Sequence, residues 1–322
     1  MLLAGVDGGG TKTVCVVADE NGRVLGLGSS GPSNYHVTGL AASLEVVGES
    51  LRKASGWRHV DYLTVGLAGL DTRYDVGLYL EALRRQGLAG DCHAMHDAEI
   101  ALLGGTGGGP GIIVIAGTGS VASGMNRSGR YARAGGWGYI LGDEGSAYDI
   151  GRRGLVAVLR AYDGRGRKTA LTEKLLKALG VSNPEEMLRR VYVDKMGVTG
   201  IAALAAHVTE AAAEGDPVAL DIVRSAAESL AELAIAVGAR LGMLSEHVRI
   251  VTVGGVFKAG ELVLKPFREK LRTRFASFEL MKPLFPPVIG ALLASYKRAG
   301  IPVAPLIPSL MAQCRALGLK TG

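Results

Sequence analysis

Short apolar runs separated by glycine-rich turns open the chain. Leu2 to Val6, Thr13 to Ala18 and Val24 to Leu27 are apolar or β-branched, with turn-forming residues between them. This pattern predicts three strands joined by two tight turns. Apolar residues then recur at helical spacing in Leu40 to Ala54, and Leu63 to Leu67 is a continuous apolar run. We therefore expect a helix followed by a buried strand.

The following segments continue this alternation of helices and strands. Tyr74 to Gln86 is expected to be helical and His93 to His96 to form a short strand. Glu99 to Leu103 starts a helix that the Gly104 to Gly111 run is expected to interrupt. Near the end of the chain, Val288 to Ala299 predicts a final helix, which a proline-containing tail follows.

The order of elements begins again at residue 111. Gly111 to Ala116 is an apolar run, Gly117-Thr118-Gly119-Ser120 is a glycine-rich turn, and Val121 to Met125 is a second strand. This weak internal symmetry predicts an α/β protein of two similar domains that face each other across a cleft. The predicted domains are residues 1–110, joined by the last helix at 288–299, and residues 111–287, with a helical insertion at 146–244.

The composition supports large cores and an anionic ligand. The chain has 322 residues, 48% of them hydrophobic, which favours two domains. Its 48 glycines are about twice the usual share of roughly 7%. The net charge of +6 favours anions such as nucleotides. Because basic residues are scattered and aromatic residues make up only 5%, we do not expect the protein to bind nucleic acid.

The cysteines and the absence of long apolar runs bear on the compartment. Cys15, Cys92 and Cys314 are odd in number and lack CxxC spacing, which argues against a disulfide framework and against a thiolate metal site. The first residues run directly into a strand, and no apolar run approaches the ~20 residues of a membrane span. We expect a soluble cytoplasmic protein that does not contact a membrane.

The first glycine-rich turn is a candidate phosphate site. The stretch from Asp7 to Thr13 lies between two predicted strands, which excludes the P-loop and the GxGxxG motif because both lead into a helix. The backbone of Gly10 can approach a phosphate, Thr11 can donate a hydrogen bond and Lys12 adds positive charge. Asp7 can hold Mg²⁺ directly or through water. The alternative is a hairpin without a ligand.

Two further turns add to this interpretation. The second turn carries Thr118 and Gly119 at the matching place of the second half, and two such turns can bind the phosphates of one nucleotide from both sides. Gly254, Gly255 and Phe257 follow another predicted strand. Glycines there can let an adenine pass close to the backbone. An ordinary corner between a strand and a helix explains them equally well.

Residues 135–148 carry the most specific pattern of the chain, Gly-Gly-Trp-Gly-Tyr-Ile-Leu-Gly-Asp-Glu-Gly-Ser-Ala-Tyr. With the glycine-rich turns, this stretch resembles the acetate kinase, sugar kinase, Hsp70 and actin superfamily, and within it the N-acetylglucosamine kinases and BadF/BadG ATPases. The resemblance implies two ribonuclease H-like, actin-like ATPase domains, with ATP and Mg²⁺ as cofactors. It also implies that the protein transfers the γ-phosphate to the 6-hydroxyl of N-acetylglucosamine, glucosamine or glucose. Related kinases imply a homodimer.

Asp97 is the candidate catalytic base. Phosphorylation of a sugar hydroxyl needs a carboxylate that orients the hydroxyl and accepts its proton late in a loose transition state. Asp97 follows a predicted strand, where related kinases place their base. The local sequence alone favours a cap of the next helix.

The resemblance also implies a set of sugar-binding residues. Trp137 could instead belong to the core, and Glu144 and Ser146 are better explained as caps of the next helix. The loop Ala68-Gly69-Leu70 lacks the serine that relatives often have, which leaves open how an N-acetyl group is held. The candidates for sugar binding are Asn34, Asp97, Ser120, Gly135, Gly136, Trp137 and Asp143.

The adenine end has one more candidate. Ala212 lies in a helix end that resembles the segment bordering adenine in such kinases, and plain helix packing explains it equally well.

Two other functions are compatible with this resemblance. An ATPase that activates a dehydratase or reductase by electron transfer would need cysteines for an iron–sulfur cluster, which the three cysteines here do not provide. A non-catalytic sugar sensor would not need Asp97.

Overall fold

The computed structural model describes residues 1–319 of the chain. It divides into two compact units, residues 1–111 with the chain from Lys282 onward, and residues 112–281. Each unit is built on one five-stranded sheet. In the part of the chain that the structure describes, no helix is long and apolar enough to cross a membrane.

The first unit has a mixed sheet with β1 at its centre. The strands lie in the order β3-β2-β1-β4-β5, with β2 antiparallel to its neighbours and with β4 and β5 parallel to β1. Because parallel strands end at the same edge, the loops after β1, β4 and β5 meet there. The strands are β1 (Leu2–Gly8), β2 (Thr13–Asp19), β3 (Val24–Ser30), β4 (Val60–Leu67) and β5 (Ala89–His96).

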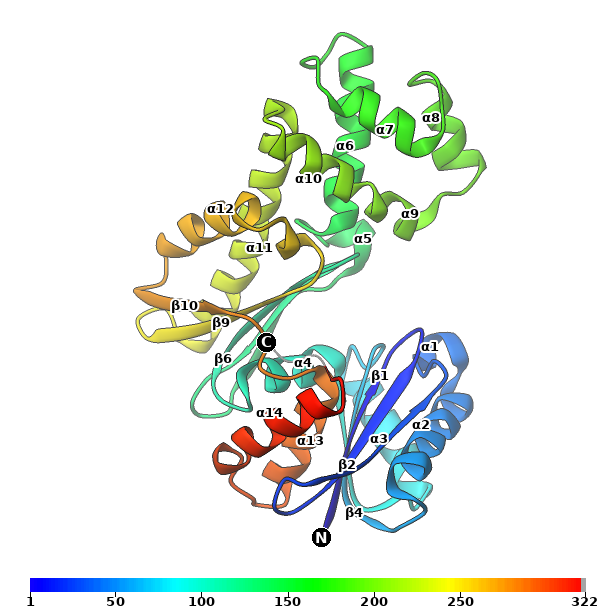
Figure 1. Ribbon diagram of the computed structural model, residues 1–322, viewed down its shortest axis with the longest axis vertical. Coiled ribbons are helices and arrows are strands. Elements are labelled where there is room, and N and C mark those ends of the chain that lie inside the picture. The colour runs from blue at the N-terminus through cyan, green and yellow to red at the C-terminus, as the bar shows by residue number, and fades with distance from the viewer. Residues whose placement is uncertain (320–322) are drawn as a thin grey trace. The chain divides into compact units, whose positions relative to one another are not determined.

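Helices cover both faces of this sheet. On one face, α2 (Leu40–Ser55) and α3 (Arg73–Arg85) bury Val6 and Leu63. On the other, α13 and α14 bury Leu3 and Val16, and Figure 1 shows these two helices, in orange and red, against the sheet of the chain's first residues. The remaining bounds are α1 (Tyr35–Thr38), α4 (Asp97–Thr106), α13 (Pro287–Arg298), η3 (Ala304–Leu306) and α14 (Ile307–Ala316).

Two glycines bring α13 close to the sheet and to α4. A Cβ atom at Gly5 on β1 would lie 2.2 Å from the backbone nitrogen of Leu292 on α13. A Cβ atom at Gly290 on α13 would lie 1.8 Å from the backbone oxygen of Ile100 on α4. Only glycine fits at such distances. This packing fixes α4, which begins at Asp97.

The second unit repeats the topology of the first. Its strands lie in the order β10-β9-β6-β7-β8, with β9 parallel to β6, β10 parallel to β9 and β8 antiparallel to β7. The central strand of each unit is therefore its first strand, which confirms the internal repeat. The strands are β6 (Gly111–Ala116), β7 (Ser120–Met125), β8 (Tyr131–Gly135), β9 (His247–Val253) and β10 (Ser277–Met281).

The helices of this unit share one core with the sheet, which joins Val114 of β6 to Leu175 and Val208 of the helical segment. Figure 1 shows α6 to α10 gathered at one end of this unit, away from β9 and β10. Their bounds are α5 (Gly138–Leu141), α6 (Ala147–Tyr162), α7 (Leu171–Leu179), α8 (Glu186–Leu188), the π-helical turn η1 (Arg189–Val193), α9 (Gly197–Ala203), α10 (Ala205–Ala213), α11 (Pro217–Leu241), η2 (Val256–Ala259) and α12 (Glu261–Arg272).

Two expectations about these elements were wrong. The glycine run does not interrupt α4, which continues through Gly104 to Thr106, because Gly104 packs against the backbone of Pro286 where a side chain would not fit. The helix over 288–299 is not the final one, since Ile307 to Ala316 form α14 in the tail that follows it, with Leu310 and Cys314 buried.

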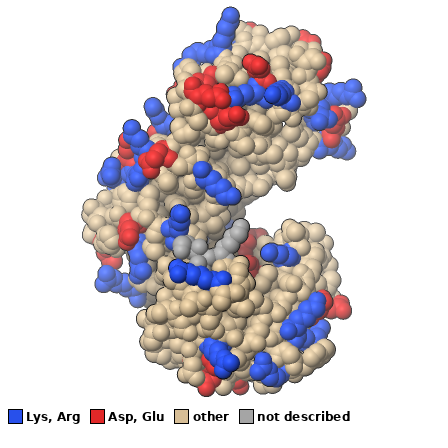
Figure 2. Space-filling model, in the orientation of Figure 1, with Lys and Arg blue, Asp and Glu red and all other residues tan. Residues whose placement is uncertain are grey.

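Charged side chains on the face shown in Figure 2 are interspersed, with blue and red groups intermingled across the second unit. Mixed charge of this kind is typical of a solvated surface.

Candidate active site

The glycine-rich hairpin of the first unit joins β1 to β2. Gly8 pairs with Thr13, and the Gly9 amide donates a hydrogen bond to the Lys12 carbonyl at 3.1 Å. A Cβ atom at Gly8 would lie 2.2 Å from Leu67 Cδ2, so only glycine lets the hairpin pass over β4. Gly10, Thr11 and Lys12 are exposed at its tip. Backbone and side-chain donors at the tip are therefore accessible to a ligand.

Thr13, in contrast, serves the structure. It is fully buried, and its Oγ1 lies 2.8 Å from the Gly31 carbonyl oxygen and 2.7 Å from Ser33 Oγ. The Ser33 amide donates to the Gly9 carbonyl at 3.0 Å. These contacts fix the hairpin to the loop that carries Asn34.

Asn34 lies beside the loop that follows β4. Its Oδ1 accepts a hydrogen bond from the His36 amide at 3.1 Å and caps α1. Gly69 has a φ of +96°, and a Cβ atom there would lie 2.8 Å from Asn34 Oδ1. The Ala68 amide donates to the Gly8 carbonyl at 3.0 Å. The hairpin, Asn34 and the loop at Gly69 thus form one connected surface at the strand ends.

Two carboxylates meet at the same edge. Asp7 on β1 pairs in register with Gly66 on β4, which pairs with Met95 on β5, two residues before Asp97. Burial and, next, the negative charge of Asp97 together raise the pKa of Asp7 to about 6, against the opposing effect of Lys12. An acidic pair of this kind favours a positive ligand or a shared proton.

Asp97 does not cap α4. His96 is the cap residue, since its Nδ1 lies 2.9 Å from the Ala98 amide nitrogen. Asp97 is the first helical residue, and its side chain is 42% exposed. The capping role that the local sequence favoured for Asp97 is therefore wrong, and its carboxylate can reach a ligand.

In the second unit, the turn after β6 is tied to Asp143. The Gly117 amide donates to the Gly119 carbonyl at 2.9 Å, and the Ser120 amide donates to Asp143 Oδ1 at 3.0 Å. A Cβ atom at Gly119 would lie 2.9 Å from both carboxylate oxygens of Asp143. Asp143 is buried and has a φ of +63°. The turn with Thr118 and the most specific stretch of the sequence therefore form one structure.

The start of that stretch is exposed. Gly135 and Gly136 have φ values of +73° and +71°, and the Gly136 amide donates to the Ser120 carbonyl at 2.9 Å. Trp137 is 67% exposed, with the Arg133 guanidinium 5.2 Å from its ring centre. Trp137 is therefore not a core residue.

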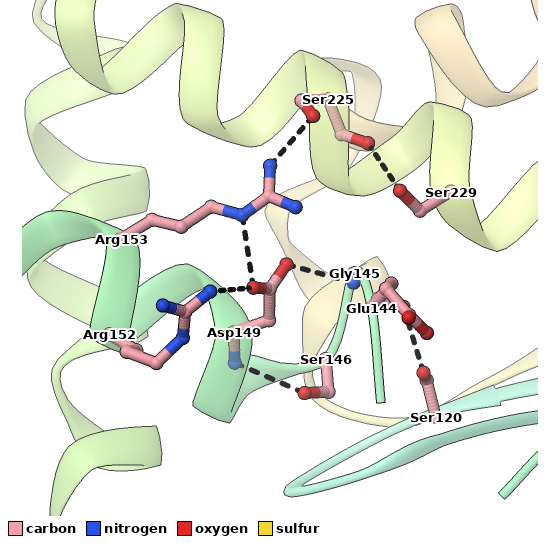
Figure 3. Close-up of polar contacts among 9 residues, drawn as sticks. All are labelled: Ser120, Glu144, Gly145, Ser146, Asp149, Arg152, Arg153, Ser225 and Ser229. Carbon is pink, nitrogen blue, oxygen red and sulfur yellow. Dashed lines mark hydrogen bonds and ion pairs between the residues drawn. The ribbon is translucent and has the colours of Figure 1, made fainter. Parts of the chain in front are cut away.

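The end of the stretch is held by the buried carboxylate of Asp149 on α6, drawn in Figure 3. Asp149 Oδ2 accepts from the Gly145 amide at 3.1 Å, and Oδ1 accepts from Arg153 Nε at 2.9 Å. Arg153 also donates to Ser225 on α11 at 2.7 Å. Ser146 accepts from the Asp149 amide, which confirms Ser146 as a cap, whereas the Glu144 carbonyl accepts from Ser120 Oγ at 2.8 Å.

Arg153 is expected to contribute more than its neighbour Arg152 to this arrangement. Replacing Arg153 with Met leaves Asp149 poorly paired and removes the bridge to Ser225, so we expect a loss of about 1–3 kcal/mol in the free energy of unfolding. Arg152 is half exposed and contacts Asp149 at 3.2 Å, so Arg152→Met should cost less than about 1 kcal/mol. Urea unfolding of both variants tests the difference, and equal losses would contradict it.

The adenine candidates differ in exposure. Gly254 has a φ of +113°, and a Cβ atom there would lie 2.2 Å from the Ala116 carbonyl oxygen. A Cβ atom at Gly255 would meet no heavy atom within 4 Å. The side chains of Ala212 and Phe257 are buried in the core, where Phe257 packs edge-on against Phe267 at 5.5 Å. The side chains of Ala212 and Phe257 therefore pack in the core, so only the backbone of these residues could contact an adenine base.

Two features escaped the sequence analysis. The first is the contact of His96 with Asp97, for which the adjacency of the two residues was the available signal. The second is the Asp149 network, which the spacing of Ser146 and Asp149 at a helix start indicates.

The profile of the BadF/BadG/BcrA/BcrD ATPase family matches residues 4–295. The chain belongs to this family. Its membership confirms the resemblance inferred from residues 135–148.

Two proteins with curated names are similar to this chain over nearly its whole length. An N-acetylmuramic acid/N-acetylglucosamine kinase of Clostridium acetobutylicum is 34% identical, over 90% of this chain and 97% of that protein. An N-acetyl-D-glucosamine kinase of Dictyostelium discoideum is 31% identical, over 91% of this chain and 97% of that protein.

Solved structures share the fold. A structure from Chromobacterium violaceum is 29% identical with a TM-score of 0.68, covering 91% of this chain and 98% of its own. A ROK family glucokinase of Streptomyces griseus, 22% identical with a TM-score of 0.53 and covering 92% and 98%, is similar in fold. The expected class of two α/β, actin-like ATPase domains is confirmed.

Proposed function

We propose that this protein is an ATP-dependent sugar kinase that transfers the γ-phosphate to the 6-hydroxyl of N-acetylglucosamine or of a related hexose such as glucosamine or glucose. The observation that carries this proposal is the exposed carboxylate of Asp97 beside the partly buried carboxylate of Asp7. Relatives 34% and 31% identical to this chain are named as an N-acetylmuramic acid/N-acetylglucosamine kinase and an N-acetyl-D-glucosamine kinase.

Asp97 acts as the general base in this proposal. Its exposed carboxylate would hydrogen-bond the hydroxyl of a sugar bound at the strand edge and would accept the hydroxyl proton as the new bond between oxygen and phosphorus forms. The bond between the γ-phosphorus and the bridging oxygen of ADP breaks in the same step. Most of the rate increase then comes from positioning and from charge stabilisation.

We assign the ATP phosphates to the exposed hairpin tip at Gly10, Thr11 and Lys12, and to Thr118 and Gly119 of the second unit. Backbone amides and hydroxyls at such turns suit phosphate oxygens. For the adenine we propose the backbone at Gly254 and Gly255, bordered by Ala212 and Phe257.

Magnesium fits the residues of the first unit. In the described chain, residues 1–319, no three His, Cys, Asp or Glu side chains cluster as a metal site, but Mg²⁺ usually keeps several waters and needs only one or two carboxylates with the substrate phosphates. Burial and the negative charge of Asp97 raise the pKa of Asp7, and the second of these, a neighbouring like charge, favours a cation beside the two carboxylates. We propose that Asp7 holds Mg²⁺, directly or through a water molecule, and that the ion would neutralise charge on the transferring phosphate.

We propose Asn34 as a sugar ligand from the first unit, together with Asp97. From the second unit we propose Ser120, Gly135, Gly136, Trp137 and Asp143. The contacts of Asp143 with the turn at Gly119 and the exposure of Trp137 support this assignment.

A panel of sugars tests the proposal. With ADP release coupled to a spectroscopic readout, we expect phosphorylation of N-acetylglucosamine, and kcat/KM values for glucose and glucosamine within about two orders of magnitude, because the loop at Gly69 offers no hydroxyl for the amide. A preference above about a thousandfold for one sugar would contradict the relaxed pocket.

Electron transfer to a partner enzyme receives no support from the thiols. Cys15, Cys92 and Cys314 are buried, and burial raises the pKa of each thiol, whereas cluster ligands must be thiolates. Buried, unpaired thiols support a reducing cytoplasm as the proposed location. We also propose a homodimer, by analogy with related kinases. Light scattering of the purified protein would test this oligomeric state.

A further inference from the structure

His96 connects two carboxylates of the first unit. Its Nε2 lies 3.0 Å from Asp71 Oδ1 in the loop after β4. Its Nδ1 lies 2.9 Å from Asp97 Oδ1 at the start of α4. The ring is largely buried, with 14% of the side chain exposed, whereas both carboxylates are more than 40% exposed. The imidazole is therefore the fixed part of this arrangement.

We propose that His96 is a positioning residue for phosphoryl transfer, which holds the Asp97 carboxylate in place through Nδ1 while Asp71 holds the ring through Nε2. This inference rests on the proposed kinase function. In this proposal His96 orients the Asp97 carboxylate in addition to capping α4, and Asp71 acts on Asp97 indirectly, by holding the His96 ring.

The proton on Nδ1 decides which partner the ring serves. Nδ1 lies 2.9 Å from the Ala98 amide nitrogen as well as 2.9 Å from Asp97 Oδ1. A neutral ring with its proton on Nε2 can only accept from Ala98 at Nδ1, whereas an imidazolium donates to Asp97. The charged ring therefore positions the base, and the neutral ring caps the helix.

The surroundings favour the charged ring at neutral pH. Burial lowers the pKa of His96, but the hydrogen bonds to Asp71 and Asp97 outweigh burial and raise the pKa to about 9 from its usual 6.5. Glu99 shares the first turn of α4, and Asp7 on β1 acts on Asp97. Since the folded pKa is raised, the contact is present below about pH 9 and is lost as the pH rises through that value.

The test compares kcat, KM and pH profiles of three variants with the wild type, using N-acetylglucosamine and ATP. In His96→Gln we expect kcat to fall by about 10- to 100-fold, with KM for the sugar changed less than about threefold, because a misplaced base slows the chemical step more than binding. The fall in wild-type kcat above pH 9 should be absent in this variant. In Asp71→Asn the same fall should move to lower pH, because the ring loses a carboxylate partner.

His59→Gln is the matched control, since it makes the same change at an exposed site before β4, and it should behave as the wild type. If His96→Gln does not fold by circular dichroism, the pH profile of Asp71→Asn decides alone. Wild-type values of kcat and an unmoved pH profile in the folded variants would overturn the role of His96. A wild-type protein that phosphorylates no sugar would instead refute the proposed function itself.

Discussion

Asp97→Asn is expected to lower kcat by about 10²–10⁴, the usual contribution of a positioned base, and to leave sugar affinity nearly unchanged. The side chain keeps its shape and can still hydrogen-bond a hydroxyl, but it can no longer accept the proton. Because Asp97 is not the N-cap residue of α4, the replacement should not remove a helix cap. Steady-state kinetics with calorimetric titration of the sugar separate the two effects.

Asp91→Asn provides the matched control for this variant. Asp91 lies near the start of β5, the strand that ends just before Asp97. It forms an ion pair with Arg298 at the surface, so the control should keep its activity and lose at most about 1 kcal/mol of stability. Near-normal turnover of Asp97→Asn would remove Asp97 from the mechanism.

Asp7→Asn is expected to have opposite effects on activity and on stability. Without the carboxylate, kcat/KM for ATP with Mg²⁺ should fall by about 10²–10³, the order of a lost electrostatic contact to a transferring group. The metal-free protein should become more stable at pH 8, by about 1–3 kcal/mol, because a carboxyl with a pKa near 6 resists ionisation in the folded state.

The sign of the pH dependence follows from the raised pKa. The folded wild type binds more protons than the unfolded chain between about pH 4 and pH 6, so this group lowers the stability as the pH rises through that range. The stability difference between Asp7→Asn and wild type should therefore be near zero at pH 4 and largest above pH 6. Urea unfolding in EDTA at the two pH values measures it, and a difference independent of pH would contradict the raised pKa of Asp7.

Much of the fold followed from local patterns. The apolar runs of β1, β2 and β6 and the two glycine turns were visible because their residues are buried in nearly every position. The short edge strands β8 and β10 were not predicted, since each has five residues of mostly partial exposure and so lacks a clear alternation. Edge strands depend on pairing with a neighbour that lies far away in the sequence.

The sequence predicted which residues are candidates for the site better than it predicted which residues they contact. Asp97 followed from its place after a strand, whereas its contact with His96 depends on side-chain orientation at the helix start. Asp143 is buried and has a φ of +63°. This conformation, and the short distance between Gly119 and the Asp143 carboxylate, arise from chain segments that folding brings together. Such contacts leave no local signal in the sequence.

The identity of the phosphorylated product tests the central claim most directly. The purified protein would be incubated with ATP, Mg²⁺ and N-acetylglucosamine, ADP would be quantified, and the product examined by phosphorus and proton NMR. We predict one equivalent of sugar phosphate for each ADP, with the phosphate on the 6-hydroxyl. ADP release that does not depend on the sugar, with inorganic phosphate as the product, would contradict the account and indicate an ATPase with another role.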